Sequence, residues 1–401
     1  MKVAQRETLA LRGREFFVYI LKGKGRNMKV PWTINPYIPF PGVERGFFPY
    51  QSKDLVALSA SVEEGLQYLF QTKNEVLVFP GRGAAALEGA VVNFFSPQDK
   101  VVVGIMGEGG KEWAQIGERF GLQVLRLGSK RGEVITAKDI ELLFRSEAGK
   151  DIKGVFITHN EISTGVMADI RELGKVCREH NVLLGVDALN SLGIADLKTD
   201  EWGVDVVAGT GSKALKLPGL DLSFLSVSNK GWKYNNKAHC PRYYFDLAKI
   251  GEGFHRPLPE DFYYLLLLDG ALQAIKKEGL ENIFAYHQKF SFMLRRGIEA
   301  LGLELLVNDE HIASPSVVAI KIKPEWEGEK IASFLEREGI ATIGGESRLR
   351  EKIILIDHSG CGGAFDIANI VVTLGRALKA QGVVVDLAKS LAQVWEVYDS
   401  E

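Results

Sequence analysis

Residues 76–90 read VLVFPGRGAAALEGA, in which an apolar strand, a glycine-rich turn and a helix follow one another. Short apolar strands that alternate with amphipathic helices predict a parallel sheet with helices on both faces. Helices separate most of the other predicted strands, which cover residues 100–105, 123–127, 154–159, 182–188 and 204–209. The sequence therefore predicts an α/β fold built around a mostly parallel sheet.

The alternation of strands and helices changes near residue 250, which predicts a second, smaller domain. Two helices, over residues 261–279 and 282–300, lead into a compact α+β segment of about a hundred residues, an ordinary domain size. The proline-rich stretch NPYIPFPGVERGFFPY predicts an irregular N-terminal arm. We expect the arm over residues 1–50, a large domain over 51–285 and a small domain over 286–401, with a ligand cleft between the two domains.

The charge balance and the cysteines narrow the class of protein. The formal net charge of −2 gives no reason to expect nucleic acid or an anionic membrane surface as a partner. No apolar run approaches the roughly 20 residues that span a bilayer, and the first residues lack the apolar centre of a signal peptide. The 3 cysteines lack CxxC spacing, which favours a reduced, cytoplasmic protein without a zinc or disulfide framework.

The glycine-rich turn at residues 81–86 is a candidate phosphate site. Free backbone amides at the start of a helix suit an anion. The pattern Gly81-x-Gly83-x-x-Ala86 also matches a dinucleotide fingerprint, but the expected acidic residue is misplaced, because Asp99 precedes the next strand instead of ending it. A tight turn needed only for packing explains this stretch equally well.

Two ionisable residues end other predicted strands. Asp187 ends VLLGVDA, where an unpaired carboxylate is costly to bury, so it either caps the turn or meets a cation such as a protonated pyridine nitrogen. Lys213 follows the strand over 204–209. A lysine there is usually a solvated charge, but an amine beside low-dielectric walls becomes a nucleophile towards carbonyls. Ser212 offers a hydroxyl to a phosphate, and Lys216 is expected to be an ordinary surface charge.

These three strand ends together describe one cofactor. Pyridoxal phosphate needs an anion cradle, an acid at its ring nitrogen and a lysine that forms a Schiff base. We therefore expect Lys213 to carry pyridoxal phosphate.

The sequence also resembles the class V aminotransferases of pyridoxal phosphate fold type I, specifically the alanine–glyoxylate/serine–pyruvate group. The likeness runs from about Ser52 to Ala380. It is carried by GLQYLFQTKNEVLVFPGRGAAALEGA, WAQIGERFG, ITHNEISTGVM, VDALNSLGIADL, GSKAL and KKEGLENI. It implies a large domain with a mostly parallel seven-stranded sheet, a smaller C-terminal α+β domain, an amino donor and a keto acceptor as substrates, and a homodimer with shared active sites.

The same resemblance implies roles for individual residues. Lys213 would be the Schiff-base lysine and Asp187 the partner of the pyridine nitrogen. Leu189 would touch the cofactor ring. The phosphate would be surrounded by Arg82, Gly83, Ala84 and Ser212.

Three positions depart from the family pattern. The aromatic residue that usually stacks on the cofactor falls on Gly109, and Trp113 nearby lies within a predicted helix. A serine that faces the cofactor is replaced by Ile162. The arginine that binds the substrate carboxylate falls on Leu355.

Three functions therefore compete, with transamination of a small amino acid or amine in the lead. A lyase or desulfurase on the same fold is the second, but Cys361 follows the last predicted strand, whereas a desulfurase cysteine precedes it. A nicotinamide-binding oxidoreductase or a nucleotide binder would leave Asp187 and Lys213 unexplained.

The sequence leaves two alternatives for the substrate. Arg82, Arg348 or Arg350 could replace the missing arginine, or the substrate could lack an α-carboxylate, with Glu346 or Asp357 favouring an amine. We lean towards an unusual substrate and expect poor turnover of alanine with glyoxylate.

Overall fold

The computed structural model describes residues 5–11, 14–20, 53–216, 221–254, 262–343 and 353–400, and the chain divides into two units, Met1–Asn35 and Pro36–Glu401. In the first unit, β1 (Gln5–Leu11) pairs antiparallel with β2 (Arg14–Ile20). The sequence analysis did not predict these strands. The rest of the predicted arm lies outside the described residues.

A seven-stranded sheet forms the centre of the second unit. Its order is β3-β11-β10-β9-β6-β4-β5, and only β11 runs antiparallel to its neighbours. The predicted α/β class and mostly parallel seven-stranded sheet are therefore confirmed. The strands are β3 (Glu75–Pro80), β4 (Lys100–Ile105), β5 (Gln123–Gly128), β6 (Ile152–Thr158), β9 (Leu183–Asp187), β10 (Val206–Thr210) and β11 (Leu222–Val227). The sequence analysis located all of these except β11, whose LSFLSV sequence is buried throughout and shows no simple alternation.

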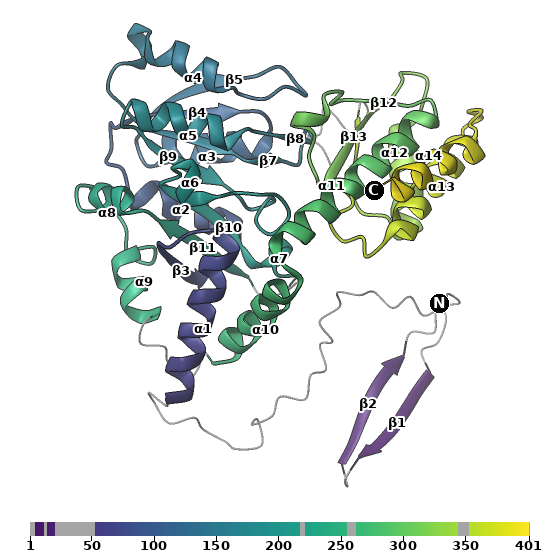
Figure 1. Ribbon diagram of the computed structural model, residues 1–401, viewed down its shortest axis with the longest axis horizontal. Helices are drawn as coiled ribbons and strands as arrows, with labels where there is room; N and C mark the ends of the chain where they lie inside the picture. Colours follow the sequence, from purple (N-terminus) through teal and green to yellow (C-terminus); the bar gives the residue numbers. More distant parts are fainter. Residues whose placement is uncertain are drawn as a thin grey trace. The chain divides into compact units, whose positions relative to one another are not determined.

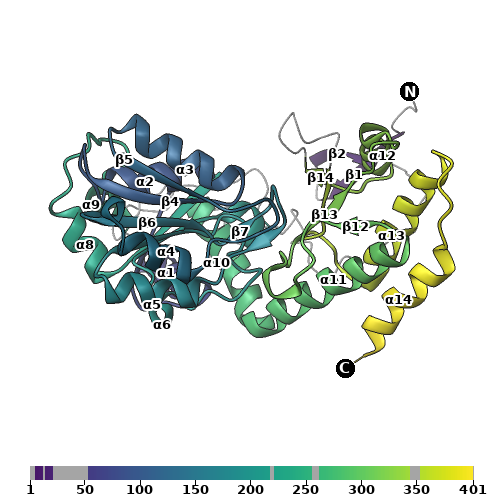
Figure 2. The same cartoon turned by 90° about the horizontal axis from the view of Figure 1, so that it is seen from above.

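Helices cover both faces of this sheet, as expected for parallel strands (Figures 1 and 2). One face carries α2 (Gly83–Val92) and α3 (Glu108–Arg119), and the other carries helices that include α1 (Lys53–Phe70) and α5 (Ile170–Glu179). Trp113 of α3 is 1% exposed, and its ring lies 4.4 Å from that of Phe156 in β6. Burial of side chains of this size contributes about 1.5–3 kcal/mol each. The remaining helices of this part are α4 (Ala137–Phe144), α6 (Thr199–Trp202), α7 (Gly211–Ala214), α8 (Asn229–Asn235), α9 (Leu247–Phe254) and α10 (Phe262–Glu278), with the short turn η1 (Glu147–Gly149).

A second, four-stranded antiparallel sheet has the order β12-β13-β15-β14. Its strands are β12 (Glu304–Leu305), β13 (Val317–Lys321), β14 (Thr342–Ile343) and β15 (Ile353–Asp357), and it packs with α11 (Leu280–Ala300), α12 (Gly328–Arg337), α13 (Ala364–Lys379) and α14 (Leu387–Asp399). This is the predicted smaller α+β domain, and α14 is an element that the sequence analysis did not predict.

The two faces of β15 have different roles, because successive side chains of a strand point to opposite sides. Ile354 and Ile356 belong to the core formed with these helices. Ile353 and Leu355 belong to a separate apolar cluster on the other face. Asp357, at the end of the strand, shares this second face, which is the one that meets the seven-stranded sheet's domain.

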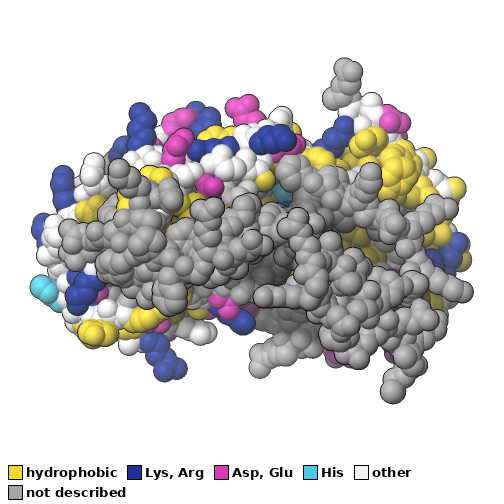
Figure 3. Space-filling model, turned by 90° about the horizontal axis from the view of Figure 1, so that it is seen from below, with side chains coloured by type: hydrophobic (Ala, Val, Ile, Leu, Met, Phe, Trp, Pro, Cys, Tyr) yellow, Lys and Arg dark blue, Asp and Glu magenta, His cyan; other side chains and the backbone are white. Residues whose placement is uncertain are grey.

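Charges of both signs are interspersed over the described part of the face in Figure 3. Such a mixed surface agrees with the nearly neutral net charge. Of the helices in the described ranges, none is both long enough and apolar enough to cross a membrane.

Candidate functional site

The candidate site lies at the carboxyl edge of the seven-stranded sheet, where ligands bind in folds of this kind. The polar residue at the end of β6 pairs in register with the end of β9, since Thr158 is opposite Asp187. Asp187 in turn is opposite Ala208 of β10, and the chain of β10 continues into α7, which carries Lys213. Three adjacent strands thus deliver Thr158, Asp187 and Lys213 to one edge of the sheet.

Asp187 is a buried carboxylate whose two oxygens are both bonded. The Leu189 backbone N–H donates to Oδ1 at 2.9 Å, and the Thr158 hydroxyl donates to Oδ2 at 3.1 Å. The side chain is only 2% exposed. Burial raises the pKa of Asp187 to about 7, and the nearby Glu161 carboxylate acts in the same direction. A cation beside Oδ2 would reverse this shift and keep the carboxylate ionised.

Gly109 lets the start of α3 approach this carboxylate closely. A Cβ at this position would lie 2.9 Å from Thr158 Oγ1, 3.1 Å from Glu161 Oε2 and 3.2 Å from Asp187 Oδ2. The Gly109 N–H donates to Glu161 Oε2 at 2.9 Å, while the backbone N–H and hydroxyl of Ser163 donate to Oε1. The glycine therefore keeps the space in front of Asp187 free of a side chain.

The turn between β3 and α2 supplies the start of a helix. No side chain caps α2, and no acidic residue lies in its first turn. The turn is held by Ser223 of β11, whose hydroxyl donates to the carbonyl oxygens of Gly81 and Arg82 at 3.1 and 2.8 Å. Leu189 packs against Gly83, where a Cβ would come within 2.7 Å of Leu189 Cδ1. The uncapped amides of α2 therefore lie beside the segment that follows Asp187.

Lys213 meets the second sheet through one ion pair. Its ammonium donates to Asp357 Oδ2 at 3.1 Å. Both the backbone N–H and the hydroxyl of Ser359 donate to Asp357 Oδ1, at 2.9 and 2.6 Å. Burial alone would raise the pKa of Asp357, but the Lys213 ammonium and the Ser359 hydrogen bonds lower it below its ordinary value. Ser212, beside Lys213, is exposed.

Two of the departures from the family pattern lie together. Ile162 packs against the cluster that contains Leu355, together with Val317, Ala319 and Ile353. Leu355 itself is 1% exposed. Residues 162 and 355, which are far apart in sequence, thus form one apolar surface on the side of the second sheet.

These residues fit pyridoxal phosphate. The buried Asp187 carboxylate lacks a cation among its described hydrogen-bond partners, and a protonated pyridine nitrogen would supply one. Gly109 leaves in front of this carboxylate a space that a Cβ would fill. The uncapped start of α2 offers N–H groups to a phosphate, and Lys213 offers an amine from α7, directly after the neighbouring strand β10.

Other predicted residues lie apart from this group or outside the described part. Arg82 has an 84% exposed side chain and pairs with Asp221 at 3.2 Å. Trp113 is a core residue, as its helical position suggested. Burial raises the pKa of Cys361 to about 12, which disfavours a reactive thiolate. Glu346, Arg348 and Arg350 lie outside the described residues.

The dinucleotide interpretation gains no support, because Asp99 pairs with Lys153 and accepts from the Ser96 backbone N–H. This position belongs to a turn before β4, away from the carboxyl end of that strand.

The sequence analysis missed Thr158 and Glu161. Both belong to the segment THNE (residues 158–161), which begins within the predicted strand over 154–159 and extends beyond it. Glu161 lies in β7 (Asn160–Glu161), which pairs with β8 (Val166–Met167). The rule that singled out Asp187, a polar residue at the end of a buried parallel strand, would have identified this fourth strand end as well.

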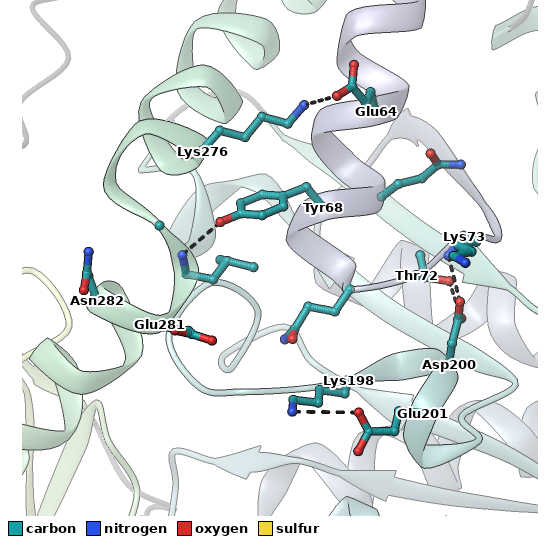
Figure 4. A pocket seen from close by; sticks show the side chains of 14 residues that line it. Glu64, Tyr68, Thr72, Lys73, Lys198, Asp200, Glu201, Lys276, Glu281 and Asn282 are labelled. Carbon is teal, nitrogen blue, oxygen red and sulfur yellow. Dashed lines mark hydrogen bonds and ion pairs between the residues drawn. The ribbon is translucent and has the colours of Figure 1, made fainter.

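A large cavity elsewhere in the described part does not compete with this site. Its volume is about 760 Å³, and none of the candidate cofactor residues lines it (Figure 4). Two ion pairs join charged groups across its lining: Lys276 with Glu64 at 2.8 Å and Lys198 with Glu201 at 3.8 Å.

Known proteins resemble this chain over most of its length. The model of the family Aminotransferase class-V matches residues 49–355. The soluble hydrogenase 42 kDa subunit of Anabaena cylindrica is 33% identical over 338 residues, which cover 83% of this chain and 88% of that protein. The alanine–glyoxylate aminotransferase of Callithrix jacchus is 31% identical over 336 residues, which cover 80% of each. The crystal structure of ureidoglycine–glyoxylate aminotransferase from Bacillus subtilis has a TM-score of 0.78 and 25% identity, and the match covers 86% of this chain and 90% of that one.

Proposed function

Since the chain belongs to the class-V aminotransferase family and is a pyridoxal phosphate-dependent aminotransferase, we propose that Lys213 attaches the cofactor and Asp187 holds its ring nitrogen. The observation that carries this proposal is the buried Asp187 carboxylate, bonded to Thr158 and Leu189, at the end of the strand next to β10, which leads into α7 and Lys213. The lyase and the nucleotide-binding alternatives are not favoured.

The remaining cofactor contacts follow from the same strand ends. The N–H groups of Gly83 and Ala84 and the hydroxyl of Ser212 would bind the phosphate, with Arg82 beside them. Leu189 would contact the ring from one side, while Gly109 at the start of α3 and Ile162 in the turn between β7 and β8 would border the site. When bound, pyridoxal phosphate withdraws electrons from the carbon that carries the substrate nitrogen.

The chain's own groups then handle the protons. Asp187 remains ionised beside a cation and keeps a proton on the ring nitrogen. The Lys213 amine, once released, would remove the proton from the substrate carbon and deliver it to the carbon on the other side of the nitrogen. Asp357 Oδ2, 3.1 Å from Lys213 Nζ, orients that amine. The amino group passes in this way from an amino donor to a keto acceptor.

Reduction with borohydride followed by peptide mapping tests the attachment. The label should fall on Lys213, and a label on Lys216 or no label would contradict the assignment. The variant Asp187→Asn should retain the cofactor but lose on the order of 100- to 1000-fold in turnover, because an amide cannot hold the ring nitrogen protonated. Unchanged turnover would rule out this role for Asp187.

We further propose a homodimer whose subunits share active sites. The resemblance to the family supports it, and so do the exposed aromatic side chains of Tyr243 and Tyr244, which are 87% and 61% exposed. The apolar residues Leu265 and Leu268 of α10 are buried within the chain and add no support. Light scattering should give twice the chain mass of 44.3 kDa. A cytoplasmic location is proposed as well, because Cys177, Cys240 and Cys361 are all free thiols.

A further inference from the structure

One face of the second sheet is an apolar surface that lies towards the candidate site, and we call this surface the apolar wall. On β15, Leu355 is flanked in register by Ala319 of β13 and Ile343 of β14. Val317 lies opposite Asp357 on β13. Ile162 from the other domain packs against the same surface. Of these positions, only residue 357 carries a charge.

That one charge is a fixed anion. Ser359 holds Oδ1 of Asp357 with two hydrogen bonds, so the carboxylate cannot turn away. Oδ2 points to the Lys213 amine at 3.1 Å. The substrate amine that takes the place of the Lys213 amine therefore reacts beside the Asp357 carboxylate. This carboxylate attracts the ammonium group of an incoming substrate and repels a carboxylate on the carbon that carries that ammonium group.

A substrate carboxylate would need a cationic partner, best supplied by the fork of a guanidinium. The wall residues at 162, 317, 319 and 355 offer none, and burying a carboxylate against them would be strongly unfavourable. Two described cations lie near this surface: the charge of Lys216 reaches His287 and Cys361 near the end of β15, and Arg131 lines a cavity with Leu306 and Ile353. The experiment must therefore test Lys216 and Arg131 as well.

We propose that the amino donor of this enzyme is a primary amine whose amine-bearing carbon carries no carboxylate. This inference rests on the proposed role of Lys213. In the half-reaction the C–N bond and one C–H bond of the amine break, and the carbon leaves as an aldehyde or ketone whose oxygen comes from water. The nitrogen and the hydrogen stay on the enzyme-bound cofactor until the keto acceptor takes them up.

The test uses the holoenzyme and matched donor pairs that differ only in the carboxylate: ethylamine and alanine, butylamine and norvaline, benzylamine and phenylglycine. The decay of the visible absorption of the lysine-bound cofactor gives the rate of each half-reaction. At least one amine should react tenfold or more faster than its amino acid partner. Equal or faster reaction of the amino acids, or no reaction with any amine, would overturn the proposal.

Two variants of Leu355 test whether the lack of a guanidinium in the wall causes the preference for amines. Leu355→Arg should shift the preference towards the amino acids by tenfold or more, since it places a guanidinium in the wall. Its control, Leu355→Met, changes the shape without adding charge and should leave the preference on the amine side. If alanine reacts rapidly and Lys216→Met, Arg131→Met, Arg348→Ala or Arg350→Ala abolishes that reaction, the proposal is wrong and the carboxylate binds there.

The outcome separates two kinds of failure. A protein that binds no cofactor, or carries it on a lysine other than Lys213, contradicts the proposed function itself. A protein that carries it on Lys213 and prefers alanine contradicts only the inference about the donor.

Discussion

The two surfaces that meet at Lys213 differ in polarity. At the edge of the seven-stranded sheet, the carboxylates of Asp187 and Glu161 are buried and each has hydrogen-bond donors on both oxygens. On the second sheet the facing surface is apolar apart from Asp357, and behind it His358 is buried with neither ring nitrogen bonded. The first surface keeps the strand-end carboxylate expected for a cofactor and departs from the family pattern at Gly109, whereas the second carries Leu355 in place of the family's arginine. If the proposed roles are correct, cofactor chemistry and donor specificity depend on separate elements, and variants should change them separately.

The largest expected effect comes from removing the amine between the two surfaces. Lys213→Ala should lower transamination on the order of 10⁴-fold, because the same group attaches the cofactor and transfers the proton. Turnover and the visible absorption of the bound cofactor would be measured together. Lys216→Ala, three residues away, serves as the control and should keep the attached cofactor. If both variants behaved alike, neither lysine would have the assigned role.

Several features of this comparison could be predicted from the sequence. Strand-end reasoning selected Asp187 and Lys213 as candidates, since Asp187 ends one short apolar strand of the parallel sheet and Lys213 follows another. The ion pair between Lys213 and Asp357 joins residues 144 positions apart, and it depends on how two domains pack. The contact of Ile162 with Leu355 has the same origin. Periodicity within a strand carries no information on either contact, so the substrate surface was visible in the sequence only as isolated departures from a family pattern.

Asp187 on the first surface and His358 on the second should make the free energy of unfolding depend on pH in opposite directions. In the cofactor-free protein the pKa of Asp187 is raised to about 7, so between about pH 4 and pH 7 the folded state holds a proton that the unfolded state has lost. This contribution to stability is present below about pH 4 and is lost as the pH rises towards 7. A shift of about 3 pKa units corresponds to roughly 4 kcal/mol.

Asp187→Asn should therefore stabilise the cofactor-free protein at pH 8 by up to about 4 kcal/mol, with little gain near pH 4. Denaturant unfolding across this range would measure the difference. A variant that is equally stable or less stable at pH 8 would show that Asp187 has an ionic partner in solution.

On the second surface, burial lowers the pKa of His358 to about 3, and the neighbouring His287 acts in the same direction. Below about pH 6.5 His358 is protonated in the unfolded chain but neutral in the folded state, so the free energy of unfolding decreases as the pH falls towards 3. At pH 5 the loss amounts to about 2 kcal/mol for this residue. His358→Leu should flatten the acid side of the stability curve between pH 6.5 and 4. His180→Leu, which removes a half-exposed histidine paired with Glu141, is the control and should leave most of that slope. A slope unchanged by His358→Leu would assign the acid sensitivity to other groups.

The smallest expected effect comes from filling the space in front of Asp187, which tests whether the residues around this space can move. Gly109→Ala places a methyl group 2.9 Å from Thr158 Oγ1, which is closer than a carbon and an oxygen normally approach. The Thr158 hydroxyl must then move, and its hydrogen bond to Asp187 Oδ2 weakens. We expect a loss of about 1–2 kcal/mol in unfolding free energy, together with weaker cofactor binding, from overpacking and the lost hydrogen bond. Gly270→Ala in α10 is the matched control, because no atom lies within 4 Å of its Cβ, and it should stabilise the helix by about 0.5–1 kcal/mol. If Gly109→Ala were as well tolerated as this control, the space before Asp187 would be adaptable, and the contrast between a rigid cofactor surface and a plain apolar wall would fail.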